Sequence, residues 1–324
     1  MTIAQQKQHL RIHGRVPFNE NGRAQLWWSF SGFSFCFDGT GFSFSASFSD
    51  EQPGIVSVVI DGITHKRAVD GDNTFSFAMK EGAHVVTIRR TSKRTDSLAI
   101  NICDLSVDGT FLEPPAEKQM KIEFFGDSIT CGYGVLGLPS HHCWLTHQED
   151  TAYSYAALTA AHFDAEARLI SISGHGVVHN FGKDRRMLIP KAFRWSGSEP
   201  DTAEWDFADG FMPDVVVINA GTNDVAGGTT ADEMQEGATA FIQNIRAQYP
   251  DAKIVWTYGM MNTDFIPPID AAVKQLRETD KNVWFLPTTP IWKYEGQSAA
   301  NGHPGVVGQR RLAKELISLL EKIL

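Results

Sequence analysis

The hydrophobic pattern of this 324-residue chain changes its period once, and the change divides the chain into two parts. In residues 1–112, apolar and polar residues alternate, as in GFSFCFDGTGFSFSASF. Such alternation is typical of strands, because successive side chains point to opposite faces of a sheet. Beyond residues 113–118, apolar residues form short continuous runs separated by helical patterns. The chain is therefore expected to have two domains of different fold class.

The first domain, residues 1–112, is predicted to be an all-β sandwich of the jelly-roll type. Phe33–Phe37 and Phe42–Phe48 alternate on either side of Asp38–Gly41, which predicts a β-hairpin with one buried aromatic face. Further short strand-like runs follow, without convincing helical periodicity. Several short strands without helices are typical of a sandwich. Two prolines among charged residues predict a linker over residues 113–118.

The second domain, residues 119–324, is predicted to be an α/β domain with a five-stranded parallel sheet. Its strands are expected in the apolar runs at residues 121–126, 167–173, 214–221, 253–259 and 282–287. Continuous apolar runs favour a parallel sheet whose two faces are both covered. Helices are predicted over Thr151–Phe163 and Thr230–Tyr249, the second with a capping box. A leucine stripe near the C-terminus predicts a last helix packed on the sheet.

Charge and composition disfavour several classes of partner. The net charge is −9 and the pI about 5.6, without a cluster of Lys or Arg, which argues against nucleic acid and anionic membranes. No run approaches the roughly 18 apolar residues of a membrane helix. The first residues, MTIAQQKQHLRIHG, lack the apolar region of a secretion signal, so we expect a cytoplasmic protein unless a signal has been removed. The oligomeric state is left open.

The cysteines and histidines do not predict a metal site. Cys36, Cys103, Cys131 and Cys143 are scattered and form no C-x-x-C, which favours reduced thiols, with one disulfide as an open alternative. The stretch HHCWLTH at residues 141–147 lacks the ligand spacing of a metal motif. Neither a metal nor another cofactor is therefore expected.

Four polar, glycine-bearing loops are expected to meet at one edge of the parallel sheet. They are Gly126–Ser128, Ser173–Gly176, Gly221–Asp224 and Asn301–Gly305. Ligands bind beyond the carboxyl ends of parallel strands, where such loops lie. The loops supply a serine, histidines, a side-chain amide and accessible backbone amides, which are the components of an acyl-transfer site. Ser128 alone could equally cap a helix, because Ser accepts hydrogen bonds from free amides there.

Taken in order, the blocks GDS, SGHG, GTND and HPGVVG resemble the signature blocks of SGNH (GDSL-type) hydrolases. Ser128 does not lie in a G-x-S-x-G motif, which disfavours an ordinary α/β-hydrolase. The preceding β domain, with SGHGVVHNF and GHPGVVGQRRLA, resembles carbohydrate esterase family 2 more narrowly. That resemblance implies a jelly roll followed by an SGNH domain. It also implies removal of acetyl groups from sugars, with a preference for the 6-hydroxyl of hexoses.

The resemblance also implies roles for individual residues. Ser128 matches the nucleophile and His303 the general base, which must lie within hydrogen-bond reach of the serine. The amide N–H groups of Ser128 and Gly174 and the side-chain amide of Asn223 match the three oxyanion-hole donors. Asp127 is interpreted as a scaffold residue, as is the aspartate that follows Asn223.

The position three residues before His303 departs from the family pattern. SGNH hydrolases usually carry an aspartate there, whereas this chain has Ala300. Some family 2 esterases work as a Ser–His dyad in which a main-chain carbonyl replaces the carboxylate. We therefore expect His303 Nδ1 to donate to a backbone carbonyl of a nearby loop, with the Asn301 side chain as the alternative. A carboxylate on Nδ1, for instance from Glu295, would instead indicate a triad.

Substrate-binding residues are harder to predict from one sequence. His175, Trp205 and Trp292 are the candidates, because they lie in loops near the expected site. A solvated histidine and a tryptophan packed in the core are the ordinary alternatives. The expected partner is an acetylated sugar or oligosaccharide. The rival hypotheses are an SGNH lipase or thioesterase acting on other acyl esters, and a carbohydrate-binding protein with an inert hydrolase domain.

Overall fold

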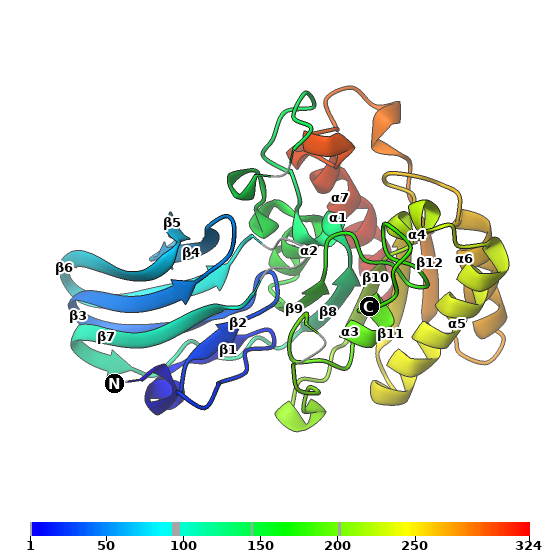
Figure 1. Cartoon of the computed structure of the whole chain (residues 1–324). Coiled ribbons are helices and arrows are strands. Elements are labelled where there is room, and N and C mark those ends of the chain that lie inside the picture. The colour runs from blue at the N-terminus through cyan, green and yellow to red at the C-terminus, as the bar shows by residue number, and fades with distance from the viewer. Residues whose placement is uncertain (1, 93–97, 144, 200–201) are drawn as a thin grey trace.

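The computed structural model describes residues 2–92, 98–143, 145–199 and 202–324. Figure 1 shows two parts side by side, an all-β part near the N-terminus and a part in which helices surround a sheet. The last strand of the first part ends at Leu112 and the first strand of the second begins at Lys121. The prediction of an all-β domain followed by an α/β domain is confirmed.

The N-terminal domain is one antiparallel sheet that curls around its own core. A short 3₁₀-helix, Ile3–His9, precedes it. The strands are β1 Arg11–His13, β2 Ala24–Leu26, β3 Gly32–Phe48, β4 Gly54–Ile60, β5 Ile63–Val69, β6 Gly71–Arg90 and β7 Ile100–Leu112. They pair in the order β2-β7-β3-β6-β4-β5, with β1 also on β3. The inner face buries phenylalanine side chains, among them Phe33, Phe35, Phe37, Phe42 and Phe44.

The predicted hairpin at Asp38–Gly41 is wrong, because β3 runs through this stretch as a single bent strand. Gly39 of β3 pairs with Gly82 of β6 on one side and with Gly109 of β7 on the other. A Cβ on Gly39 would lie 2.2 Å from a carbonyl oxygen of β7, so the strands approach too closely there for a side chain. Glycine within a strand marks a bulge or tight bend. The glycines therefore bend three neighbouring strands together instead of reversing the chain, which explains the few long strands where many short ones were expected.

The C-terminal domain contains the predicted five-stranded parallel sheet. Its strands are β8 Lys121–Gly126, β9 Glu166–Ser171, β10 Val215–Asn219, β11 Lys253–Tyr258 and β12 Val283–Pro287, in the order β12-β11-β10-β8-β9. All neighbours are parallel. The chain order reverses between β8 and β10, which is the switch point where such sheets bind ligands.

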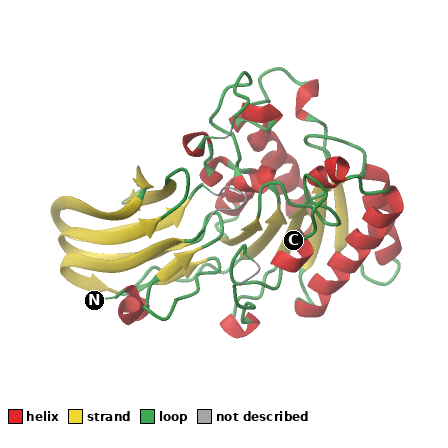
Figure 2. Cartoon of the chain, viewed as in Figure 1, coloured by secondary structure: helices red, strands yellow, loops and turns green. Residues whose placement is uncertain are grey.

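Helices cover both faces of this sheet (Figure 2). They are α1 Ser128–Cys131, α2 Tyr155–His162, α3 Ile189–Ala192, α4 Thr222–Gly227, α5 Ala231–Gln248, α6 Ile266–Leu276 and α7 Val306–Ile323. Short 3₁₀-turns occur at Thr146–Gln148, Thr151–Tyr153, Phe207–Asp209, Ile291–Lys293 and Ala300–Gly302. The α5 and α6 side chains share one core with the sheet, and those of α2 and α7 share the other. Among the described helices, none is long and apolar enough to cross a membrane.

The predicted helices are mostly present, with two differences. The helix expected over Thr151–Phe163 begins as a 3₁₀-turn, and α2 starts only at Tyr155, where Ser154 caps it. Helix α6 had no sequence prediction, and it opens with Ile266-Pro267-Pro268. Prolines suggest a loop, but they are tolerated in the first turn of a helix, where the amide has no partner to lose.

A buried ion pair between Arg15 and Glu123 forms the first of two junctions between the domains. Nη2 of Arg15 lies 3.0 Å from Oε1 of Glu123, and both side chains are fully buried. Arg15 also donates to the carbonyls of Phe193 and Trp195. Because a buried charge is stable only when it is paired and hydrogen-bonded, these contacts fix the two domains against one another.

The second junction is a hydrogen-bonded chain through His13. Its Nδ1 lies 2.7 Å from Oε1 of Glu166, and its Nε2 lies 2.6 Å from Oγ of Ser34. Ser34 in turn contacts the hydroxyl of Thr87 at 2.7 Å. Burial lowers the pKa of His13 to about 4. The three side chains of Ser34, His13 and Glu166 are each more than nine-tenths buried, so this chain connects strands β3 and β9 away from solvent.

Removing one partner of the buried pair should destabilise the protein strongly. Arg15→Met leaves Glu123 charged and buried, and we expect it to lower the free energy of unfolding by about 3–5 kcal/mol in urea titrations followed by circular dichroism. Arg15→Met combined with Glu123→Leu should recover most of that loss, because Arg168, the other buried cation near Glu123, keeps its ion pair with Asp209. As the control, Arg11→Met removes the exposed Arg11–Glu117 pair and should cost less than about 1 kcal/mol. Equal losses in the two single variants would contradict a special role for the buried pair.

Candidate active site

Ser128 is placed at the end of β8 by a tight strand-to-helix turn. β8 ends at Gly126, where a Cβ would lie 2.0 Å from Oγ1 of Thr130, so only glycine fits. Asp127 then caps α1, its carboxylate accepting from the N–H of Ile129 at 3.0 Å. The cap is therefore Asp127, which leaves the hydroxyl of Ser128 for another partner.

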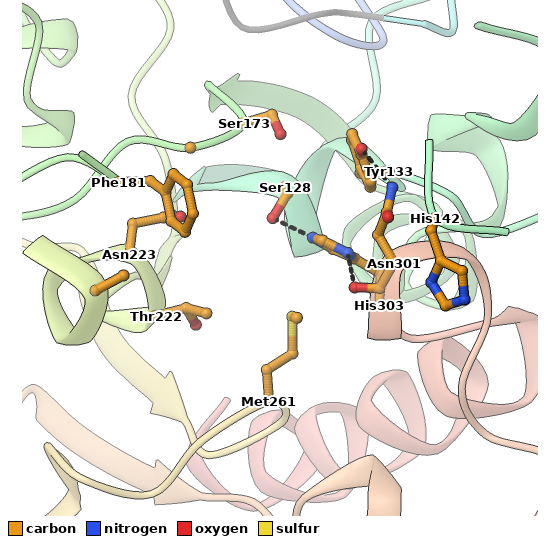
Figure 3. A pocket seen from close by; sticks show the side chains of 12 residues that line it. Ser128, Tyr133, His142, Ser173, Phe181, Thr222, Asn223, Met261, Asn301 and His303 are labelled. Carbon is orange, nitrogen blue, oxygen red and sulfur yellow. Dashed lines mark hydrogen bonds between the residues drawn. The ribbon is translucent and has the colours of Figure 1, made fainter. Parts of the chain in front are cut away.

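That partner is His303. Nε2 of His303 lies 2.8 Å from Oγ of Ser128, although the two residues are 175 positions apart (Figure 3). His303 follows the 3₁₀-turn Ala300–Gly302 and directly precedes the loop into α7. This distance lets the ring nitrogen take a proton from the hydroxyl.

The other ring nitrogen contacts a backbone carbonyl. Nδ1 of His303 lies 3.2 Å from the carbonyl oxygen of Asn301, two residues earlier in the same loop. Among the described residues, no Asp or Glu oxygen makes a hydrogen bond or ion pair with this ring. The geometry thus agrees with a Ser–His dyad supported by a carbonyl, although the carbonyl belongs to the histidine's own loop.

The environment of His303 keeps its ring neutral. Burial lowers the pKa of His303 from the ordinary value of 6.5 to about 4, against a smaller opposing effect of the hydrogen bond to Asn301. A neutral ring whose Nδ1–H donates to a carbonyl has its lone pair on Nε2, which faces Ser128. The side chain is therefore in the state that a general base requires near neutral pH.

Gly174 and Asn223 line the same cavity as the serine and histidine. Gly174 has φ +81°, in the left-handed region that favours glycine, and lies in the loop after β9. Asn223 lies in the first turn of α4, after β10, and its Nδ2 donates to the carbonyl of His175 at 2.8 Å. The same nitrogen also donates to Oδ2 of Asp127 at a longer 3.4 Å, so the His175 bond orients the amide and the weaker Asp127 contact occupies its second hydrogen.

The aspartates of the first and third blocks accept hydrogen bonds that hold neighbouring loops in place. Asp224 accepts the N–H groups of Val177, Val178 and His179 at 2.7–2.9 Å, which holds the loop that follows Gly174. Burial raises the pKa of Asp127 to about 7, against the opposing effect of the hydrogen bond from Ile129. Both side chains are fully buried and do not line the cavity.

The cavity measures about 600 Å³ and has a mixed lining. Its residues are Ser128, Tyr133, His142, Ser173, Gly174, Phe181, Thr222, Asn223, Ala226, Met261, Asn301 and His303. Figure 3 shows their side chains gathered around the Ser128–His303 contact. Hydroxyl, amide and imidazole groups alternate with one methionine and two aromatic rings, a lining that suits a polar ligand with apolar faces.

The three substrate-binding candidates of the sequence analysis do not line this cavity. The His175 side chain is buried, and its Nδ1 contacts the carbonyl of Met187. The Trp205 ring lies within 5.6 Å of the guanidinium carbons of Arg15 and Arg168, near the domain junction. Trp292 is exposed beside Lys293. Trp205 therefore packs inside the protein, which was the alternative to a sugar-binding role.

Several lining residues were missed by the sequence analysis. Tyr133 follows the first sequence block by five residues and was not considered, and the Asn301 side chain was considered only as a partner of His303 and not as part of the cavity lining. Met261 lies just after the carboxyl end of β11, and the rule that ligands bind beyond strand ends could have predicted it. Phe181 is 69% exposed and lies in a long loop after β9, for which the sequence holds no periodic signal.

One structural observation bears on whether the chain could hold a metal ion. Within the described ranges, no three His, Cys, Asp or Glu side chains gather closely enough to hold an ion. In the 141–147 stretch, His141 Nδ1 accepts hydrogen bonds from the N–H of Leu138 and from the side chain of Gln148. Through these hydrogen bonds, His141 stabilises the loop that borders the cavity.

Comparison with known proteins gives two domain matches and several relatives. Residues 124–311 match the GDSL-like lipase/acylhydrolase family, and residues 12–115 match the carbohydrate esterase 2 N-terminal family. Cellulase/esterase CelE of Acetivibrio thermocellus is 32% identical over 263 residues, covering 77% of this chain but 31% of that protein. An acetylxylan esterase / glucomannan deacetylase of Cellvibrio japonicus is 26% identical over 339 residues, covering 100% of this chain and 91% of the relative.

Solved structures agree with this assignment. A family two carbohydrate esterase from Clostridium thermocellum, in complex with cellohexaose, superimposes with a TM-score of 0.89 at 25% identity, covering 97% of this chain and 98% of that one. A family two carbohydrate esterase from Cellvibrio japonicus has the same fold, with a TM-score of 0.89 at 23% identity and coverage of 100% and 97%. The chain belongs to the GDSL-like lipase/acylhydrolase family and carries a carbohydrate esterase 2 N-terminal domain ahead of the hydrolase domain.

Proposed function

We propose that this protein is a carbohydrate O-acetyl esterase that works through an acyl-enzyme on Ser128. The observation that carries the proposal is the 2.8 Å contact between Ser128 Oγ and His303 Nε2 inside a cavity that also holds Gly174 and Asn223. The names of the relatives, which include acetylxylan esterase / glucomannan deacetylase and family two carbohydrate esterase, support the substrate class. We further propose two kinds of substrate: gluco-oligosaccharides acetylated at the 6-hydroxyl, and acetylated xylo-oligosaccharides, whose pentose rings have no 6-hydroxyl and carry the acetyl group on a ring hydroxyl.

The first half-reaction transfers the acetyl group to the enzyme. Ser128 Oγ attacks the carbonyl carbon of the ester while its proton passes to Nε2 of His303. The negative charge on the carbonyl oxygen is stabilised by the N–H groups of Ser128 and Gly174 and by Nδ2 of Asn223. When the intermediate collapses, the bond to the sugar oxygen breaks and the sugar leaves with the proton that His303 returns. The product is acetyl-Ser128 and a free sugar hydroxyl.

The second half-reaction releases acetate. A water molecule attacks the acetyl carbonyl and gives its proton to His303 Nε2, and the same donors stabilise the oxyanion. The bond to Ser128 Oγ then breaks, and His303 returns the proton to the serine oxygen. These steps use only Ser128, His303, the three oxyanion donors and one water molecule.

The lining of the cavity supports a sugar over a long acyl chain. Hydroxyl, amide and imidazole groups from Ser173, Thr222, Asn301 and His142 reach it, and such groups match the hydroxyls of a sugar. A lipase or thioesterase acting on long chains would need a continuous apolar trough. The intact Ser128, Gly174, Asn223 and His303 disfavour an inert carbohydrate-binding protein.

The function is tested by acetate release from a panel of acetylated mono- and oligosaccharides, together with p-nitrophenyl acetate and octanoate. We expect release from the sugars and faster hydrolysis of the acetate than of the octanoate. Faster hydrolysis of the octanoate would favour the lipase or thioesterase reading. A zero rate on every ester would favour the inert binding protein.

The pH dependence follows from the state of His303, which must be neutral to accept the serine proton. Since its pKa lies at about 4, the base stays competent until the pH falls through that value. We expect kcat/KM at pH 5.5 to stay within about twofold of its value at pH 7.5. A base with an ordinary pKa would instead lose about 90% of the rate at pH 5.5. Initial rates on p-nitrophenyl acetate measure this, and circular dichroism at each pH checks that the fold is retained.

A further inference from the structure

The carbonyl that accepts from His303 belongs to a residue with unusual backbone geometry. Asn301 has φ +52° and ψ +32°, which places it in the left-handed region. Few residues other than glycine adopt this region readily, and asparagine is one of them. The direction of the Asn301 carbonyl follows from these backbone angles. The ring of His303 can therefore be fixed only as well as the backbone of Asn301 is fixed.

A carbonyl is a weaker guide for the ring than a carboxylate would be. It carries no full charge, and the 3.2 Å distance between Nδ1 and the Asn301 oxygen is at the long end of the range for such bonds. Charged acceptors form shorter and roughly twice stronger hydrogen bonds. Some other contact must then hold the loop if Nε2 of His303 is to remain directed at Ser128.

Two contacts hold Asn301: its backbone N–H donates to the carbonyl of His141 at 2.8 Å, and its side chain is held by Tyr133, from the loop that follows the nucleophile. The side-chain Nδ2 of Asn301 donates to the hydroxyl oxygen of Tyr133 at 2.9 Å, as Figure 3 shows. The N–H of Tyr133 donates to the carbonyl of Ser128 at 3.0 Å. The Tyr133 ring also lies against the His303 ring, with 4.4 Å between their centroids. One side chain thus connects the nucleophile's turn to the residue that orients the base.

We propose that Tyr133 is a positioning residue for His303 and that it acts through Asn301. Its hydroxyl holds the Asn301 side chain, which keeps the backbone of Asn301 in the left-handed conformation and its carbonyl directed at Nδ1. The carbonyl then keeps the proton on Nδ1 and the lone pair of Nε2 on the serine. In this protein a tyrosine and an asparagine together do the orienting that a carboxylate does in a triad.

Two other roles for Tyr133 make different predictions. A residue that only binds the sugar would change KM, because its contacts would be alike in the ground state and the transition state. A residue that only packs in the loop would change stability, without dependence on Asn301. A positioning residue changes kcat, and its effect disappears once Asn301 can no longer transmit it.

The kinetic test uses Tyr133→Phe, Asn301→Gly and the double variant. Tyr133→Phe removes one oxygen and keeps the ring on His303. Asn301→Gly removes the amide and keeps access to positive φ. We expect each single variant to lower kcat by about tenfold on p-nitrophenyl acetate and on an acetylated oligosaccharide alike, with KM for the oligosaccharide within about twofold, and the double variant to lose no more than either single one. Tyr153→Phe, on the exposed 3₁₀-turn outside the cavity, is the matched control and should leave the rate unchanged.

A second readout does not depend on ester hydrolysis, since the proposal otherwise rests on the proposed function. In ¹⁵N-labelled protein, the His303 ring signals, assigned by their loss in His303→Ala, report which nitrogen carries the proton. The wild type should show the Nδ1–H tautomer, and both Tyr133→Phe and Asn301→Gly should show a mixture with the Nε2–H tautomer. An unchanged tautomer in these variants, a rise in KM with constant kcat, or additive losses in the double variant would overturn the proposal. A wild type inactive on every ester, with the tautomer shift intact, would overturn the proposed function alone.

Discussion

Ser128→Ala is expected to lower kcat for ester hydrolysis by a factor on the order of 10⁴–10⁶, because it removes the only atom that forms the acyl-enzyme. The fold should survive. Ser128 is the first residue of α1, alanine is a good helix former, and the hydroxyl makes its described contact with His303 rather than with the core. Initial rates on p-nitrophenyl acetate measure the loss, and circular dichroism checks the fold.

Ser34→Ala is the matched control for this variant. Ser34 also contacts a histidine ring, that of His13, and is as buried as Ser128, but it lies in strand β3 and does not line the cavity. Its replacement should cost stability while the folded protein keeps its activity. If Ser128→Ala retained more than about 5% of the wild-type rate after correction for spontaneous hydrolysis, Ser128 would not be the nucleophile.

Asn223→Ala is expected to lower kcat by a factor on the order of 10²–10³ with little change in KM. The reason is that the nucleophile and base remain, while one donor to the developing oxyanion is lost. The bond from Nδ2 to the His175 carbonyl holds this amide in place before substrate binds, and we expect the oxyanion to replace the longer 3.4 Å contact of Nδ2 with Oδ2 of Asp127. Steady-state kinetics on p-nitrophenyl acetate separates kcat from KM.

Asn101→Ala, in strand β7 of the N-terminal domain, serves as the control for loss of an asparagine amide. It should leave both kinetic constants unchanged. An Asn223→Ala variant in which only KM rises would assign Asn223 to substrate binding and leave Gly174 and Ser128 as the oxyanion donors.

The parts of the fold that were predicted from sequence depend on local patterns. Continuous apolar runs located the five parallel strands, and the Thr230–Glu233 capping box located the start of α5. The hairpin error arose because Asp38–Gly41 has the composition of a turn, whereas its glycines serve close contact with neighbouring strands. Whether a glycine reverses a strand or lets another strand approach depends on residues far away in sequence, and one chain carries no local signal for that difference.

In the candidate site too, the features that depend on local sequence order were predicted, and those that depend on contacts between distant residues were not. Ser128, Gly174 and Asn223 were brought to one cavity by a rule about strand ends, which requires only the order of elements. The link from Tyr133 through Asn301 to His303 was not predicted, because it joins two loops 168 residues apart by a single hydrogen bond. His175 and Trp205 were proposed by nearness in sequence, but their side chains turn into the protein.

Among the described residues, two serine–histidine pairs have similar geometry, and the more complete one is not at the cavity. Ser34, His13 and Glu166 reproduce the distances of a full triad, at 2.6 and 2.7 Å. Ser128 and His303 lack the carboxylate but open onto a space that a substrate can enter. A search that matched three side chains to a triad template would select Ser34 in this chain rather than Ser128, which we propose as the nucleophile. What distinguishes a reactive serine from a structural one here is room for an ester and donors for its oxygen, neither of which a template of three side chains contains.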